Sequence, residues 1–330
     1  MTDNPFSRRN ALRAAGAMAA GGLLAASAAA SASAAGVNHP GGRGQGAGRA
    51  RGRGRPPGGV KTGPGMVCYV EVNDHSMTNL GKYRLAESGA DVFDIGIIFA
   101  SNINSDGDRA VLHHNEQVTA VLENVSTEVR PLQRRGMKIL LSILGNHQGV
   151  GPANFQTYEE AVAFAAQLAD TVHTYGLDGI DFDDEWARYD LGHPPNDWSF
   201  PYLVHALRAR MPGKIISLYW YGPITETLEY DGIHVGELID YSWNSMYGTW
   251  LIPEVPGLSP EELAPAAVNI SATDDATDHA TAASLANRTV AEGYGLYNTY
   301  DLQADDASAS LTAVTTVLNG EATVYSGRPG

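Results

Sequence analysis

The chain has 330 residues and a formal net charge of −15, from 37 acidic and 22 basic side chains. Residues 1–58 hold eight arginines and Asp3 as their one acid, so the other 14 basic and 36 acidic residues give the body a charge of −22. A body this acidic argues against a nucleic-acid partner. The one cysteine, Cys68, excludes an internal disulfide and a cysteine-rich metal site.

Residues 1–35 have the composition of an export signal. Ser7-Arg8-Arg9-Asn10-Ala11-Leu12 is a twin-arginine pattern, and an alanine-rich apolar run follows it and ends at Ala32-Ser33-Ala34. We therefore expect secretion. A membrane anchor is the alternative, and the many small residues in the run disfavour it. Residues 36–62 are rich in glycine, arginine and proline, so we expect a disordered linker there.

From Met66 onward, apolar runs of strand length alternate with segments of helical periodicity. The expected strands are 66–72, 93–99, 138–144, 177–185, 214–219, 239–244, 267–271 and 294–300, and the expected helices are about 116–135, 157–176, 202–211 and 307–318. Eight strands in alternation with helices predict a closed parallel (β/α)8 TIM barrel, with residues 63–330 as one catalytic domain. A doubly wound open sheet is the alternative, but no glycine-rich phosphate loop follows the first strand.

The strand at 177–185 holds five acids within nine positions. In an extended strand, Asp181, Asp183 and Glu185 share one face, and the apolar residues between them share the other. Repulsion between these carboxylates is expected to keep a proton on one of them, which a general acid needs. Glu185, nearest the end of the strand, is the expected donor, with Asp183 as its charge-coupled neighbour. A solvated strand end and a magnesium site are the alternatives.

Catalytic residues of closed parallel barrels lie where the strands end, at the C-terminal face. Asn146, Tyr219, Asn244 and Tyr297 lie near such ends, as Glu185 does. Aromatic side chains gather there too, and beside amides and acids they suit the apolar faces and hydroxyl rims of sugars. They are Tyr69, Phe99, Trp186, Tyr189, Trp198, Tyr219, Trp220, Tyr221, Trp243, Tyr247, Trp250, Tyr297 and Tyr300.

Four fixed acids and a glycine on one strand form a specific motif. Residues 178–185, Asp-Gly-Ile-Asp-Phe-Asp-Asp-Glu, resemble the Asp-Gly-x-Asp-x-Asp-x-Glu signature of glycoside hydrolase family 18. Other segments resemble the endo-β-N-acetylglucosaminidase H group of that family rather than its chitinases, and the resemblance covers roughly residues 62–318. These segments are Tyr69-Val70-Glu71-Val72-Asn73, Gly145-Asn146-His147-Gln148-Gly149, Tyr247-Gly248-Thr249-Trp250 and Gly293-Tyr294-Gly295.

The resemblance implies a role for three of these acids. Glu185 is implied to protonate the leaving oxygen and later to activate water. Asp183 is implied to orient the substrate's own acetamido group, which attacks as the nucleophile and gives an oxazolinium intermediate, and Asp181 to share a proton with Asp183. Asn244 and Tyr247 are the candidates for holding the acetamido group, although Met246 stands where the family pattern has an aromatic residue. The candidate sugar-binding residues are Tyr69, Phe99, Asn146, His147, Gln148, Tyr219, Asn244, Trp250 and Tyr297.

The implied substrate is the core of a high-mannose or hybrid Asn-linked glycan on a glycoprotein or glycopeptide, cut between its two N-acetylglucosamines. A chitinase of the same family and a catalytically inactive glycan-binding barrel are the alternatives. Retention of Asp183 and Glu185 argues against the second of these. His147 has no second histidine at ligand spacing, which favours a hydrogen-bonding role over a metal site. We expect no metal and no cofactor, no membrane association after signal removal, and a monomer.

Overall fold

The structure is a computed structural model, and it describes residues 61–107 and 109–328. The export signal expected at 1–35, and all but the last two residues of the linker expected at 36–62, lie outside the described residues. Among the described helices, none is both long and apolar enough to span a membrane.

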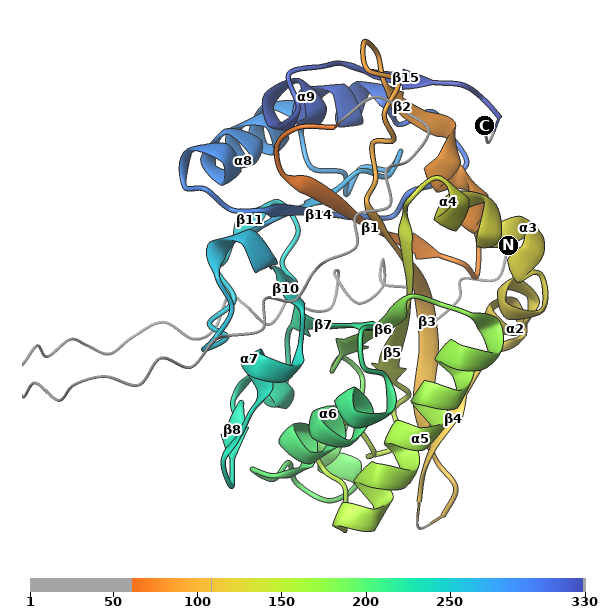
Figure 1. The fold of residues 1–330 in the computed structure, drawn as a ribbon, viewed down its shortest axis with the longest axis vertical. Coiled ribbons are helices and arrows are strands. Elements are labelled where there is room, and N and C mark those ends of the chain that lie inside the picture. Colours follow the sequence, from red (N-terminus) through yellow and green to blue (C-terminus); the bar gives the residue numbers. More distant parts are fainter. Residues whose placement is uncertain (1–60, 108, 329–330) are drawn as a thin grey trace, which may run out of the picture. The chain divides into compact units, whose positions relative to one another are not determined.

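Parallel strands lie at the centre of the described part of the chain (Figure 1), and their pairing closes the sheet into a ring. Seven unbroken strands pair in the order β14, β1, β3, β5, β6, β7 and β10. The eighth is interrupted at Pro265, which has no N–H to donate. Its first part, β12, pairs with β10, and its second part, β13, pairs with β14, which closes the ring. The bounds are β1 (Gly65–Glu71), β3 (Ile95–Ser105), β5 (Lys138–Gly145), β6 (Gly179–Asp183), β7 (Ile215–Trp220), β10 (Tyr241–Asn244), β12 (Leu263–Ala264), β13 (Ala266–Asn269) and β14 (Leu296–Tyr300). The predicted TIM barrel is therefore confirmed.

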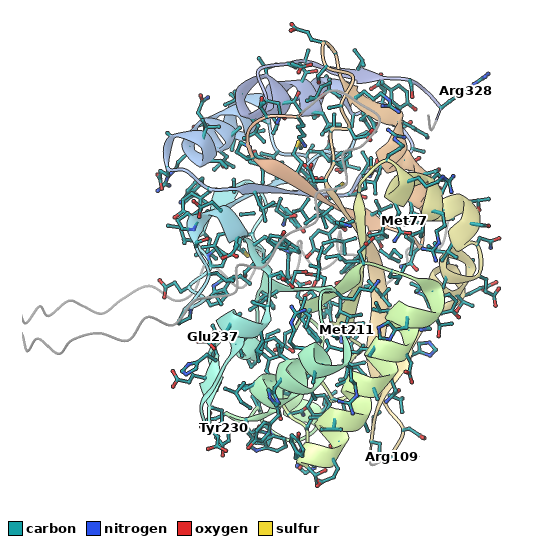
Figure 2. All side chains as sticks on the ribbon, viewed as in Figure 1. Met77, Arg109, Met211, Tyr230, Glu237 and Arg328 are labelled. Atoms are coloured by element: carbon teal, nitrogen blue, oxygen red, sulfur yellow. The ribbon has the colours of Figure 1, made fainter. Side chains whose placement is uncertain are left out.

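Shorter strands add to this ring. β4 pairs antiparallel with the end of β3, and β11 pairs antiparallel with β13. β2 pairs with β15, and β8 pairs with β9 in a separate hairpin. Figure 2 shows Arg109, at the β3–β4 turn, and Tyr230, at the β8–β9 turn, toward the same lower end of the view. The bounds are β2 (Tyr83–Leu85), β4 (Ala110–His113), β8 (Glu229–Tyr230), β9 (Ile233–His234), β11 (Thr249–Trp250) and β15 (Thr323–Tyr325).

Helices surround the ring, but not after every strand. The helix expected at 116–135 is broken into three pieces at Asn124 and Val129, in a segment that also contains Pro131. Only 3-10 turns follow β1 and β10, and α8 was not expected from the sequence. The helices are α2 (Glu116–Glu123), α3 (Val125–Glu128), α4 (Arg130–Arg134), α5 (Tyr158–Tyr175), α6 (Ser199–Arg210), α7 (Val235–Leu238), α8 (His279–Ala291) and α9 (Ser308–Leu318), and the 3-10 turns are η1 (Met77–Lys82), η2 (Tyr189–Leu191), η3 (Pro223–Thr225) and η4 (Pro260–Glu262).

The ends of α5 follow the sequence signals. The Thr157 hydroxyl accepts a 3.2 Å hydrogen bond from the Glu160 N–H, as a helix N-cap does. Gly176 ends the helix in the left-handed region, at φ 58°, which glycine adopts at little cost. Thr157 followed three positions later by Glu160 is a capping-box pattern, in which the Glu160 side chain would accept from the Thr157 N–H. Here the Glu160 carboxylate accepts from the Gln156 N–H instead, one residue earlier. This helix leads directly into β6.

The two faces of β6 differ as the alternation predicts. Ile180 and Phe182 belong to the apolar layer between sheet and helices, and the Phe182 ring meets that of Phe200 in α6 edge-on at 5.4 Å. Asp181 and Asp183 are both fully buried on the opposite face, inside the ring. The carboxylates of β6 therefore lie in the barrel interior, and its apolar face packs against the helices.

Candidate active site

Asp181 lies at the centre of a hydrogen-bond network inside the barrel. Its Oδ2 accepts from the Tyr69 hydroxyl of β1 at 2.8 Å and from the Ser142 hydroxyl of β5 at 3.0 Å. Its Oδ1 accepts from the Ser217 hydroxyl of β7 at 2.8 Å. The Trp243 indole N–H, from β10, donates to the Tyr69 oxygen at 2.7 Å. Side chains of three other strands thus bind this carboxyl group directly, and a fourth strand supports it through Tyr69.

Asp181 has an altered acidity. Its pKa is raised to about 7, and burial is the largest cause; the charge of Asp183 also acts to raise the pKa, while the hydrogen bonds from Ser217, Tyr69 and Ser142 act to lower it. From the sequence, repulsion between carboxylates was expected to keep a proton within the acidic row. In the structure, burial contributes more to the raised pKa of Asp181 than repulsion from Asp183 does. Asp181 can therefore hold that proton near neutral pH.

The backbone around Glu185 is held on both sides. The Glu185 N–H donates to Asp183 Oδ1 at 3.1 Å, and its carbonyl accepts from the Gly145 N–H at 3.0 Å. A Cβ at Gly145 would lie 2.2 Å from the Ala187 nitrogen and 2.5 Å from the Glu185 oxygen. Glycine is needed there because the loops after β5 and β6 run in direct contact. Glu185 as a whole is partly exposed, while its Oε2 is buried, so the residue lies at the boundary between the barrel interior and the surface and has a fixed backbone.

The loop after β5 runs alongside the loop after β6. The His147 N–H donates to the Trp186 carbonyl at 2.7 Å, and the two rings lie 4.9 Å apart. Asn146 donates to the Asn104 side chain at 2.8 Å, while the Gln148 side chain accepts from the backbone of β3 at 2.8 Å. Burial, and then the charge of Arg188, lower the pKa of His147, which favours its neutral form. These three candidates therefore lie in a loop that contacts both β3 and the loop that carries Glu185.

Three buried aromatic rings from different strands lie next to the acidic row. The Tyr69 ring meets Phe99 edge-on at 5.9 Å and Tyr219 edge-on at 5.7 Å. The Tyr219 hydroxyl donates to the Ser245 carbonyl at 2.7 Å. All three side chains are almost completely buried, so they form a packed apolar layer in the barrel rather than an exposed platform.

Tyr247 lies in the loop that follows β10. Its ring stacks on Tyr300 of β14, with centroids 4.9 Å apart, and the Tyr300 hydroxyl donates to the Glu71 carboxylate at 3.1 Å. Asn244 is fully buried beneath this loop. Its amide donates to the Pro265 carbonyl at 2.8 Å and to Thr249 at 3.1 Å, and it accepts from the Met246 N–H at 2.7 Å. The side chain of Asn244 thus folds the loop that carries Tyr247.

Two of the sequence candidates do not join this group. The Tyr297 hydroxyl donates to the Ala282 carbonyl of α8 at 2.9 Å, so the side chain lies on the outer face of β14. Trp250 packs edge-on against Tyr294, and the Arg288 guanidinium of α8 lies 4.2 Å from its ring centre. The chain reverses direction at β11, and this reversal brings Trp250 to the helix layer.

Tyr221 was expected from the sequence only as one of the aromatic side chains at the strand ends, and not as a candidate sugar-binding residue. It follows β7 and is 38 % exposed. Burial of its hydroxyl, and then the charges of Glu185, Asp183 and Asp184, raise its pKa. The sequence signal was present, because Tyr221 directly follows the end of a predicted barrel strand. Among residues 61–107 and 109–328, no group of three or more histidine, cysteine, aspartate or glutamate side chains is placed to hold a metal ion.

Comparisons with known proteins agree with this geometry. The chain is 48% identical over 267 residues to an endo-beta-N-acetylglucosaminidase of Flavobacterium sp. (strain SK1022), and the matched region covers 80% of this chain and 83% of the relative. It is 31% identical over 287 residues to endo-beta-N-acetylglucosaminidase F1 of Elizabethkingia meningoseptica, covering 82% of this chain and 83% of that one.

Solved structures share the fold at low identity. The crystal structure of Bacteroides thetaiotamicron EndoBT-3987 with Man5GlcNAc product matches with a TM-score of 0.69 and 24% identity, covering 82% of this chain and 65% of that chain. A GH18 chitinase from Pseudoalteromonas aurantia matches with a TM-score of 0.55 and 19% identity, covering 77% of this chain and 100% of that chain. The family model of the glycosyl hydrolases family 18 matches residues 66–250. The chain belongs to glycosyl hydrolase family 18, and within it resembles the endo-β-N-acetylglucosaminidases.

Proposed function

We propose that this protein hydrolyses the GlcNAc-β1,4-GlcNAc bond in the core of an Asn-linked glycan of the high-mannose or hybrid type, leaving one N-acetylglucosamine on the protein or peptide. The observation that carries the proposal is the row of Asp181, Asp183 and Glu185 on and just after β6, buried at its base and partly exposed at Glu185. The names of the two curated relatives support it. So does the fold shared with EndoBT-3987, a protein solved in complex with Man9GlcNAc2Asn substrate.

The catalytic acids all come from one strand and its end, and this limits the possible mechanisms. Ordinary retaining glycosidases place two carboxylates about 5 Å apart on either side of the bond, and family 18 is an exception to that rule. Asp183 and Glu185 belong to one strand and the residue pair that follows it, so both approach the sugar from one side. The nucleophile on the other side is the acetamido oxygen of the substrate.

The reaction then runs in two steps. Glu185 gives its proton to the glycosidic oxygen while the acetamido oxygen attacks C1, and an oxazolinium ion forms as the bond breaks. A water molecule next attacks C1 and gives a proton to the Glu185 carboxylate. This attack opens the oxazolinium ring and leaves the configuration at C1 retained. Asp183 stabilises the positive charge on the acetamido nitrogen, and Asp181 holds the proton that it shares with Asp183. Tyr247 donates to the acetamido oxygen from the loop that Asn244 folds.

Mass spectrometry of the products tests this proposal. The wild-type protein is incubated with a high-mannose glycopeptide, a complex-type glycopeptide and a chitin oligomer of matched concentration. We expect the high-mannose glycopeptide to lose its glycan fastest and to keep one N-acetylglucosamine. Faster cleavage of the chitin oligomer would favour a chitinase. Binding of glycan without turnover would favour an inactive glycan-binding barrel.

The export of the protein is a separate proposal. The twin-arginine pattern at Arg8 and Arg9 supports secretion of the folded protein, and the single cysteine fits a protein that needs no disulfide. Replacing both arginines by lysine should keep the protein inside the producing cell, which an immunoblot of cells and medium would detect. Equal amounts of both forms in the medium would contradict the proposal. We also propose that the secreted protein is a monomer, which its elution volume in gel filtration tests.

A further inference from the structure

Asp184 lies between two proposed catalytic acids in the sequence, yet its side chain has different partners. It is 3 % exposed. The Tyr189 hydroxyl donates to its Oδ1, and the Ile224 backbone N–H donates to its Oδ2 at 3.1 Å. Tyr189 belongs to the loop after β6, and Ile224 belongs to the loop after β7. The carboxyl group therefore joins two loops of the catalytic face.

A third loop is tied through Tyr189. Its hydroxyl oxygen accepts from the Ala153 N–H, in the loop after β5, at 3.1 Å. A Cβ at Gly151 would lie 2.3 Å from that oxygen, so the ring fits directly against the backbone of the same loop. On the other side, Gly222 has φ +75°, and a Cβ there would lie 2.8 Å from Asp184 Cβ. Two glycines thus make room for the Asp184–Tyr189 pair.

This arrangement has a direct consequence for Glu185, the next residue in the chain. The Glu185 backbone is bound to Asp183 and to Gly145, but neither contact reaches the loop after β7. Asp184 supplies that link. We propose that Asp184 is a positioning residue, which holds the Glu185 carboxyl in its reactive orientation by joining the loops after β5, β6 and β7. This inference rests on the proposed role of Glu185 as the acid.

The protonation of Asp184 is consistent with this role. Burial is the main cause that raises its pKa to about 8, and the charge of Asp183 adds to it. At neutral pH the group therefore joins the loops without adding a negative charge beside Asp183 and Glu185. The other titratable groups around it are Tyr189, from its own loop, and Tyr221, at the end of β7. Ionisation of Asp184 above about pH 8 places an additional charge among these groups.

The experiment compares kcat, KM and the pH profile of four variants on the high-mannose glycopeptide, with thermal unfolding as a check on folding. Asp184→Ala removes the link, and we expect kcat to fall about 100-fold, because small displacements of catalytic groups have effects of that order, while KM stays within about twofold. Asp184→Asn keeps the size and the neutral state, so it should recover most of the loss and keep its rate to a higher pH than the wild type. Tyr189→Phe keeps the ring and removes both hydrogen bonds of the hydroxyl, to Asp184 and from Ala153, while the Ile224 N–H still binds Asp184. We therefore expect an intermediate kcat, which tests the inference even if Asp184→Ala fails to fold.

Asp178→Asn is the matched control. Asp178 lies at the other end of the same strand, where its Oδ2 accepts from the Ile139 N–H at 2.9 Å and from the Gln133 side chain at 2.7 Å. We expect this variant to lower the unfolding temperature and leave kcat unchanged. A folded Asp184→Ala or Tyr189→Phe variant with wild-type kcat would overturn the inference, and so would an equal loss of kcat in Asp178→Asn.

The same variants separate this inference from the proposed function. If the wild type cleaves chitin oligomers and not glycopeptides, the proposed substrate is wrong, and the four variants are compared on chitin oligomers instead. The same pattern of kcat values there would support the positioning role of Asp184 with a different substrate. Equal kcat values in all variants would contradict that role.

Discussion

The Tyr69 hydroxyl donates a 2.8 Å hydrogen bond to Asp181 Oδ2 across the inside of the barrel, joining β1 to β6. The two strands are not neighbours in the sheet, since β3 and β5 lie between them. The same hydroxyl oxygen accepts from the Trp243 indole N–H. Tyr69 therefore connects the base of the acidic row to the strand whose following loop carries Tyr247.

Replacing Tyr69 by phenylalanine should reveal the strength of this connection. The variant leaves the Trp243 N–H without its acceptor and removes one of three donors to Asp181. Because a buried polar group without a partner costs about 1–3 kcal/mol, we expect the free energy of unfolding to fall by about that amount, as measured by urea denaturation. Unchanged stability would show that water or a neighbouring group replaces the hydroxyl.

The raised pKa of Asp181 predicts how stability depends on pH. An aspartate whose folded pKa lies above its unfolded value of 3.8 favours the folded state most at low pH, where it is protonated in both states. Between pH 4 and pH 7 the unfolded chain releases this proton and the folded protein keeps it, so stability decreases as the pH rises. The contribution reaches about 1.4 kcal/mol for each pH unit.

The measurement is the free energy of unfolding of the wild type and of Asp181→Asn at several pH values. The asparagine variant cannot lose that proton, so its stability should fall less steeply between pH 4 and pH 7. The slope is the readout, because the substitution also changes the hydrogen bonds from Ser142 and Ser217. Parallel curves would mean that Asp181 is ionised throughout this range.

Gly145→Ala should disturb Glu185 without touching its side chain. The added methyl group would lie 2.5 Å from the Glu185 carbonyl oxygen, so the loop after β6 must move. We expect kcat on the glycopeptide to fall by about 100-fold or more. Gly89→Ala is the control, since its Cβ would meet nothing within 4 Å. That control is strained by its φ of +67° and should lose about 1 kcal/mol of stability and no activity.

Tyr247→Phe tests the residue proposed to hold the acetamido group. The variant retains the ring that stacks on Tyr300, so folding should be preserved. Loss of one hydrogen bond to the reacting group predicts a fall of about tenfold in kcat. Tyr297→Phe removes a hydroxyl from the outer face of the barrel and should lower stability alone. Loss of activity in Tyr297→Phe, with none in Tyr247→Phe, would reverse the two assignments.

Much of the barrel could be predicted because its signals are local. Each parallel strand is a short apolar run, and the alternation within β6 separates Asp181 and Asp183 from Ile180 and Phe182. Such patterns depend on neighbouring residues only. The helix α8, His279–Ala291, was not expected because its buried face is made of small side chains, Ala282, Ala286 and Thr289, rather than large apolar ones.

The rest of the site depends on contacts between distant segments. Trp250 lies against α8 because β11 reverses the chain to pair with β13. Gly248, at φ +79°, is a local sign of a turn, but it does not indicate which strand β11 pairs with. Asn244 was a reasonable candidate for binding sugar until its amide was found bound to Pro265, 21 residues away. Tyr297 is different, since Asn298 and Tyr300 have partners inside the ring and alternation alone places Tyr297 outside.

The most direct test of the account is the rate of glycan release by Glu185→Gln, measured by mass spectrometry on a high-mannose glycopeptide beside the wild type. Glutamine has nearly the same size and cannot donate the proton, so we predict a fall in kcat of about 10²- to 10⁴-fold with normal folding and KM. Glycan release at the wild-type rate by this variant would contradict the assignment of Glu185 as the acid, and with it the proposed mechanism.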